Sequence, residues 1–277
     1  MDLKRGPSRD PFEALMGLIN GGTPFADVLT SQLRAERVWP SAATAPILHA
    51  LAVQESVMHR IEGICVFRPS NLVGVDYIPP DLDKQRLGRL AHQSQIRKRD
   101  GVWEIEIPFG DFKNHENSDL FGTPTHRVDY FRRLEDEAGL NDLLDYFFLD
   151  QRNMLRLARG NLAAFVTSRS PRMSESTWST DCRDWSARNV AWNEVAGTGF
   201  KDVLPFSPYA YRHIVGCDTL LNSDSPESER PREAARRLQT SERMIIGHYG
   251  FLLPEFSFEA GNATYSKSVQ AALSRVA

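Results

Sequence analysis

Apolar residues recur at helical spacing through most of this chain. The clearest example is residues 44 to 62, TAPILHALAVQESVMHRIE, where apolar side chains return every three or four positions. Such spacing predicts a helix with one buried face. The same pattern predicts helices in the segments 10–19, 25–36, 125–155, 177–196, 209–222, 232–251 (a helix and a short second one) and 263–276. The chain is therefore predicted to be mainly helical.

Residues 102 to 109, VWEIEIPF, show a different period. Apolar and acidic residues alternate there, which predicts a half-buried strand, and the turn-forming residues GDFKNHENS follow. Pro69 predicts the first turn of a short helix, because its missing N–H is not needed at that position. The segment NLAAFVTS fits a strand or a short helix. With no internal repeat and no clear linker, we expect one mainly α domain (α+β) with a small antiparallel β-sheet.

Composition sets broad limits. The chain has 277 residues, is 41% hydrophobic and 25% charged, and has no run approaching the roughly 20 apolar residues that span a bilayer. Its first residues lack the apolar core of a secretory signal. The three cysteines, Cys65, Cys182 and Cys217, lie far apart, so neither a disulfide framework nor a zinc site is indicated. A reducing, cytoplasmic setting with no membrane partner is expected.

The charge pattern bears on nucleic-acid binding. A net charge of −3 argues mildly against a general nucleic-acid binder, although 33 Lys and Arg are available for a local patch. Residues 84 to 99 contain no acid and hold Lys84, Arg86, Arg89, Arg97, Lys98 and Arg99. A run of this kind is most often a solvated face, and contact with a DNA backbone is the alternative.

Three local motifs carry the candidate chemistry. The first, CVFRPSNLVGV, places Arg68 at a helix start; the second, WEIEIPFGDFKN, places Lys113 in a turn after a strand. The third joins SPYAYRHIV, which contains Tyr209 and Arg212, to MIIGHYGF, which contains His248. In this order the motifs resemble the catalytic domain of the tyrosine recombinases, the phage-integrase-like family. The resemblance covers roughly residues 45 to 270.

This resemblance implies a domain division, a site and a set of partners. Residues 1–44 would be an N-terminal helical extension and 45–277 the catalytic domain, with duplex DNA as substrate, self-association into a tetrameric synapse, and no cofactor or metal. It also implies a bacterial or phage-type protein associated with the nucleoid. In the family the helical domain that completes a clamp around DNA precedes the catalytic domain, and about 45 residues are too few for it.

The family chemistry assigns a role to each site residue. Arg68 and Arg212 would hold the phosphate oxygens, since forked guanidinium donors fit them and stay charged. Lys113 would protonate the departing 5′-oxygen, and His248 would bind a phosphate oxygen or assist proton transfer. A tyrosine would attack and form a 3′-phosphotyrosine. Its expected position, about nine residues after His248, holds no tyrosine, so Tyr265 is the candidate.

One further departure keeps alternatives open. Tyr209 stands where the family has a histidine, and a phenol with a reference pKa near 10 cannot shuttle protons at neutral pH. A catalytically impaired, recombinase-derived DNA-binding or assembly protein is therefore the main alternative, and a helical protein unrelated to DNA is the third. Tyr249, directly after His248, is predicted to be a packing residue. Trp178, Trp185 and Trp192, each seven apart, are predicted to form a core stripe on one helix.

Overall fold

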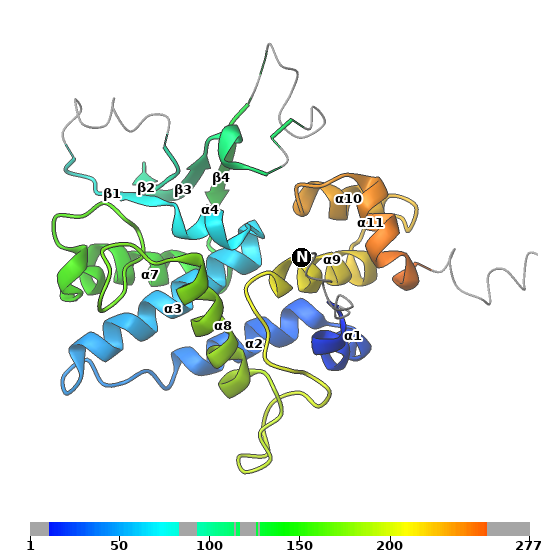
Figure 1. Ribbon diagram of the computed structural model, residues 1–277, viewed down its shortest axis with the longest axis horizontal. Helices are drawn as coiled ribbons and strands as arrows, with labels where there is room; N and C mark the ends of the chain where they lie inside the picture. Colours follow the sequence, from blue (N-terminus) through cyan, green and yellow to red (C-terminus); the bar gives the residue numbers. More distant parts are fainter. Residues whose placement is uncertain (1–10, 83–92, 114, 117–125, 127, 254–277) are drawn as a thin grey trace, which may run out of the picture.

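The computed structural model describes residues 11–82, 93–113, 115–116, 126 and 128–253. The long helix α3 runs through the middle of the molecule, with a small sheet on one side and the helices α1, α2 and α9 on the other (Figure 1). The α-helices are α1 Met16–Gly21, α2 Pro24–Glu36, α3 Pro46–Cys65, α4 Pro69–Val73, α7 Leu140–Asp145, α8 Glu175–Asn189, α9 Ala210–Asn222, α10 Arg230–Arg237 and α11 Glu242–Tyr249.

Local sequence signals set several of these helix ends. Pro24, Pro46 and Pro69 each occupy the first turn of a helix, where a missing N–H costs nothing. Ser174 caps α8 by accepting a hydrogen bond from the Thr177 amide, and Ser241 caps α11 in the same way. The helices predicted in 10–19, 25–36, 44–62, 209–222 and 232–251 and at Pro69 are confirmed within a few residues at their ends, whereas the helix predicted over 177–196 ends at Asn189.

The sheet has the strand order β1-β2-β3-β4, formed by β1 Asp76–Ile78, β2 Gln95–Arg99, β3 Val102–Ile107 and β4 Tyr130–Leu134. Strand β3 is the predicted strand, and Trp103, Ile105 and Ile107 on it are fully buried. The expectation of an antiparallel sheet was wrong in one respect. Strand β1 pairs with β2 in parallel, so the sheet is mixed, whereas β2–β3 and β3–β4 are antiparallel.

The predicted long helix over 125–155 was also wrong in its first part. Strand β4 occupies Tyr130–Leu134, because its residues alternate between partly buried and exposed and complete the hydrogen bonds of β3. Gly139, with a left-handed φ of 71°, then begins α7, and a π-helical turn over Tyr146–Asp150 follows. Residues 161–168 form only an isolated bridge, Asp76 with Ala163, rather than a strand or helix.

One hydrophobic core joins the N-terminal helices to the rest. Leu15, Leu18 and Val28 are fully buried in the same cluster as residues of α3 and α9. The Gln32 side chain of α2 donates hydrogen bonds to the Tyr211 hydroxyl (2.8 Å) and the His59 carbonyl (3.3 Å). The described part of residues 1–44 therefore packs into the same hydrophobic core as the segment that follows.

The tryptophan stripe is confirmed for two of its three members. Trp178 and Trp185 are buried on α8, whereas Trp192 lies beyond the end of that helix and is 40% exposed. Because α8 ends at Asn189, the seven-residue spacing no longer places Trp192 on the same face as Trp178 and Trp185. Among the described helices, none has the length and apolar character needed to cross a membrane.

Candidate functional site

The structure brings Arg68 and Arg212 together from positions far apart in the sequence. Arg68 is the extended residue immediately before α4, and Arg212 lies in the first turn of α9. Their charges are close enough for Arg68 to lower the pKa of the Arg212 guanidinium. The sequence predicted this pair, and the fold places it where the end of α3, α9 and the α10–α11 turn meet.

Arg212 is a buried residue held by main-chain acceptors. Its Nη1 donates to the Val66 carbonyl at 2.8 Å, and its Nη2 donates to the Leu238 carbonyl. These bonds fasten the start of α9 to the segment before Arg68 and to the turn between α10 and α11. The residue as a whole is 8% exposed.

The positive charge of this pair is poorly compensated. The Nη1 atom of Arg68 is buried and has no hydrogen-bond partner among the described residues. Burial lowers the pKa of Arg212 first of all, Arg68 lowers it further, and Tyr209, Tyr249 and Glu62 oppose this. A buried guanidinium nitrogen without an acceptor is costly.

Among the described residues, Glu62 is the carboxyl group that affects the pKa of Arg212. It does not neutralise the charge of Arg68 and Arg212. It is fully buried on α3, where the Trp178 indole donates to it at 3.4 Å and its Oε2 has no partner within the described chain. Burial raises the pKa of Glu62 to about 8, although Arg212 acts in the opposite direction. Near neutral pH this group therefore stays largely protonated and uncharged.

Lys113 lies in an exposed turn after the 3-10 helix Phe109–Asp111, as the sequence predicted. The turn is attached to α4, because the Asn71 amide of α4 donates to the Asp111 carbonyl at 3.0 Å. Phe112, beside Lys113, packs its ring near Phe67 and Tyr130. The fold thus holds the lysine's turn against the helix that begins next to Arg68.

Two other predicted residues occupy the same region with different exposure. Tyr209 immediately precedes α9, is 45% exposed, and packs its ring edge-on to that of His213. His248 is an exposed residue of α11, and within the described chain no hydrogen bond or ion pair joins it to either arginine. The arrangement brings Tyr209 to the pair and leaves His248 on the outer side of its helix.

Tyr249 is buried, as expected for a packing residue, yet it also reaches the arginine region. Its ring packs edge-on to Phe12, and its hydroxyl lies 3.1 Å from Nδ1 of His213 and 3.4 Å from the Arg212 carbonyl. Burial raises the pKa of this hydroxyl far above its usual value. The sequence assigned no chemistry to Tyr249.

The turn between α10 and α11 holds Arg212 through an uncommon backbone conformation. Gln239 has a left-handed φ of 51°, a conformation that glycine adopts freely. Leu238, the residue before it, is the one whose carbonyl accepts from Arg212.

The predicted DNA-backbone residues divide into two groups. Lys84, Arg86 and Arg89 lie outside the described residues, as does Tyr265. Arg97, Lys98 and Arg99 lie on β2 and face carboxylates from neighbouring elements. Arg97 lies 3.7 Å from Glu104 and 3.3 Å from Glu106, Lys98 lies 2.6 Å from Asp145, and Arg99 lies 3.9 Å from Glu104. Their charge is partly balanced inside the sheet.

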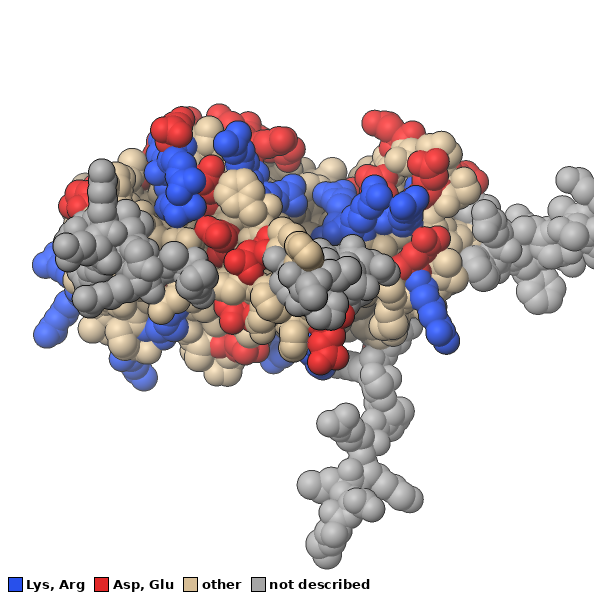
Figure 2. Space-filling view, turned by 90° about the horizontal axis from the view of Figure 1, so that it is seen from above, with Lys and Arg blue, Asp and Glu red and all other residues tan. Residues whose placement is uncertain are grey.

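A second basic surface lies over α10, which the sequence patterns did not single out. Its sequence, RPREAARR, contains four arginines, of which Arg232 and Arg236 are exposed. Figure 2 shows Lys and Arg side chains gathered over this part of the molecule and, mixed with acidic ones, over the sheet. Because α10 leads directly into the turn that binds Arg212, its exposed arginines extend the positive charge outward from the site.

Comparisons with known proteins add no assignment. No protein-family model, no curated protein and no solved structure matches this chain.

Proposed function

We propose that this protein binds duplex DNA at Arg68 and Arg212 and breaks and rejoins it through a covalent 3′-phosphotyrosine, as a tyrosine-type recombinase. The observation that carries the proposal is that two arginines, 144 residues apart in the sequence (212 − 68), lie close together. One of them, Arg68, has a buried guanidinium nitrogen without an acceptor in the described chain. The nearby carboxyl of Glu62 is held uncharged by burial. A phosphate diester supplies the missing negative charge and forked acceptors.

The surroundings favour an extended polyanion over a small one. The exposed arginines of α10, Arg232 and Arg236, continue the positive charge beyond the buried pair. A DNA backbone offers phosphates at regular intervals, and neutralising them supplies affinity through counterion release. Several copies of the protein would act together, since exchange between two duplexes needs more than one active site.

In the proposed reaction a tyrosine oxygen attacks phosphorus and the bond to the 5′-oxygen breaks. The two arginines stabilise the charge that develops on the phosphoryl oxygens. The phenolic proton passes to a nearby base, and Lys113 gives a proton to the leaving 5′-oxygen. No change of oxidation state occurs, and the phosphotyrosine preserves the bond energy for religation.

Two tyrosines are candidates for the nucleophile. Tyr265 is the candidate from the sequence and lies outside the described residues. Tyr249 is favoured by the geometry, because its hydroxyl lies 3.1 Å from His213, which can take the proton, and 3.4 Å from the Arg212 carbonyl. Attack by Tyr249 requires its buried ring to turn toward the phosphate.

A nicked suicide substrate separates the candidates. A pool of nicked duplexes of randomised sequence is incubated with the protein, and covalent protein–DNA adducts are isolated under denaturing conditions. We expect an adduct with the wild type, its loss in Tyr249→Phe, and its retention in Tyr265→Phe. The opposite pattern reassigns the nucleophile to Tyr265, and an adduct that persists in both variants rejects both tyrosines.

Binding is tested separately from cleavage. Arg68→Ala should weaken duplex binding. It should also make the association constant less dependent on salt, by about one released counterion for each phosphate that the protein no longer neutralises. Arg156→Ala, which removes an exposed arginine from a distant 3-10 helix, is the matched control and should change neither. If Arg68→Ala behaves as the control does, DNA is not held by this pair.

A second function is favoured by two observations. Tyr209 replaces a proton-transferring histidine, and Tyr249 is 6% exposed with its hydroxyl already hydrogen-bonded. Both fit a recombinase-derived DNA-binding or assembly protein without cleavage. Salt-dependent DNA binding that Arg68→Ala reduces, with no adduct from any substrate, would establish this alternative.

A further inference from the structure

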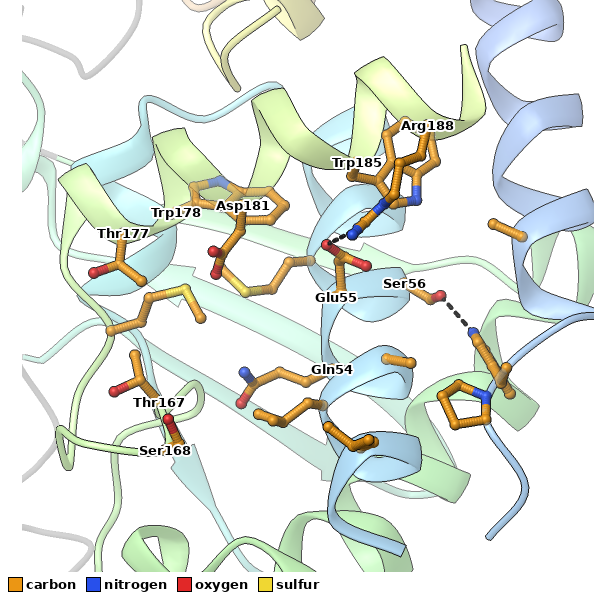
Figure 3. A pocket seen from close by; sticks show the side chains of 18 of the residues that line it. Gln54, Glu55, Ser56, Thr167, Ser168, Thr177, Trp178, Asp181, Trp185 and Arg188 are labelled. Carbon is orange, nitrogen blue, oxygen red and sulfur yellow. Dashed lines mark hydrogen bonds and ion pairs between the residues drawn. The ribbon is translucent and has the colours of Figure 1, made fainter. Parts of the chain in front are cut away.

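A cavity of about 570 Å³ lies away from the arginine pair, between α3, α8, the α2–α3 linker and the loop of residues 166–168. Figure 3 shows side chains from α3 and α8 facing one another across it. This volume falls in the range of roughly 300–1,000 Å³ that is typical of small-molecule sites. The cavity is therefore large enough for an organic ligand rather than a lone ion.

The walls are mostly apolar and are held in place. The indoles of Trp178 and Trp185 on α8 are buried beside it, together with Met173. The Gln54 amide fixes the opposite loop through two hydrogen bonds with the Val166 main chain, at 2.8 and 3.0 Å. A site with walls fastened in this way exists before a ligand arrives, which lowers the entropic cost of binding.

The cavity also carries more negative than positive charge. Glu55 of α3 and Asp181 of α8 both line it, against the guanidinium of Arg188 (Figure 3). Arg188 lies 3.5 Å from Glu55 and its side chain is 64% exposed, so it is a rim partner that can move aside. Among the described residues Asp181 has no ion pair. The negative charge of Asp184, on the same helix, contributes to raising the pKa of both Glu55 and Asp181, after burial.

The state of Glu55 agrees with this excess of negative charge. Burial raises the pKa of Glu55 to about 7; Arg188 opposes the rise, whereas Asp181 and Asp184 add to it. A cation placed between Glu55 and Asp181 would relieve both the burial cost and the repulsion. A metal ion fits less well, because no group of three or more His, Cys, Asp or Glu side chains in the described structure is arranged to hold one.

We propose that this cavity binds an organic cation, with an amine or guanidine head group between Glu55 and Asp181 and an apolar body against Leu51 and Met173. Trp178 and Trp185 of α8 form part of the apolar wall of the cavity. The proposal does not depend on the DNA chemistry, because Glu55, Asp181, Leu51 and Met173 have no part in the arginine site.

A matched series of three probes tests the charge preference: 4-phenylbutylammonium, 4-phenylbutanol and 4-phenylbutanoate, which share one apolar body. Titration calorimetry gives the affinities, and quenching of tryptophan fluorescence reports binding beside Trp178 and Trp185. We expect saturable binding of the ammonium compound, at least tenfold weaker binding of the alcohol, and weaker binding still of the carboxylate. Equal affinities, a preference for the carboxylate, or no saturable binding of the ammonium compound would overturn the proposal.

Substitutions then place the probe in the cavity. Glu55→Gln and Asp181→Asn should each weaken binding of the ammonium compound about tenfold, whereas Glu227→Gln, an exposed carboxylate elsewhere, should leave it unchanged. Ala52→Phe fills part of the cavity without altering its charge and should abolish binding while the circular dichroism spectrum stays native. Undiminished binding in Ala52→Phe rejects this cavity, even if a charge variant fails to fold.

Discussion

Glu62 gives a prediction whose size follows from its burial. The carboxyl is fully buried, and its pKa is raised from 4.5 to about 8. Between these two pH values the unfolded chain is ionised at Glu62, whereas the folded protein keeps the proton. Folding then requires proton uptake, so the contribution of this group is most favourable below pH 4.5 and is progressively lost as the pH rises to 8.

Glu62→Gln removes this titration and keeps the shape of the protonated side chain. Each pH unit between 4.5 and 8 costs the wild type about 1.4 kcal/mol. At pH 7 the penalty is about 3 kcal/mol, and at pH 5.5 it is about 1.4 kcal/mol. The Trp178 indole can donate to the amide oxygen as it does to the carboxyl, so the variant should be more stable than wild type, by an amount that increases with pH.

Urea unfolding followed by circular dichroism at a series of pH values measures the difference. We expect the stability advantage of Glu62→Gln to grow by about 2 kcal/mol from pH 5.5 to 7. Glu227→Gln, at an exposed position, should follow the wild type at every pH. Parallel curves for wild type and Glu62→Gln would refute the reasoning, because they would mean that Glu62 is ionised in the folded protein and neutralises Arg212.

Three other substitutions have definite expected outcomes. In Gly216→Ala the new Cβ would lie 2.9 Å from both the Tyr249 ring and the Leu238 side chain, so we expect the protein to be destabilised by about 1–3 kcal/mol, with a lower Tm in calorimetry; an unchanged Tm would show that α11 moves freely. Ser174→Ala removes the cap of α8 and should cost about 1 kcal/mol in urea unfolding, with Ser179→Ala, inside the same helix, as the control; equal effects would argue against the cap. Glu104→Gln removes a buried carboxylate that faces three arginines and should destabilise the protein by about 1–3 kcal/mol, and no change in the urea midpoint would mean that these ion pairs contribute nothing.

Much of the helical framework could be predicted from local sequence. Helix α3 was predicted within a few residues, because its apolar spacing and its N-terminal proline act over a few turns of chain. Strand β4 was missed, because its five residues are short and carry helix-compatible charges. Only pairing with β3, more than twenty residues away, makes that segment a strand.

The candidate site shows the same division. The residue types and their order in the chain predicted Arg68 and Arg212, and the fold places them together. The hydrogen bond from the Tyr249 hydroxyl to the Arg212 carbonyl depends on how α11 packs on α9, so local sequence did not predict it.

The sequence by itself determined where most of the helices begin, which residues could hold an anion, and that one strand precedes Lys113. These properties depend on neighbours within a few turns of the chain. The tertiary structure decided that Glu62 is buried beside Arg212, that Arg97 and Arg99 face acids from β3, and that Glu55 and Asp181 share a cavity. Burial and charge compensation depend on which distant segments pack together, so no local pattern contains them.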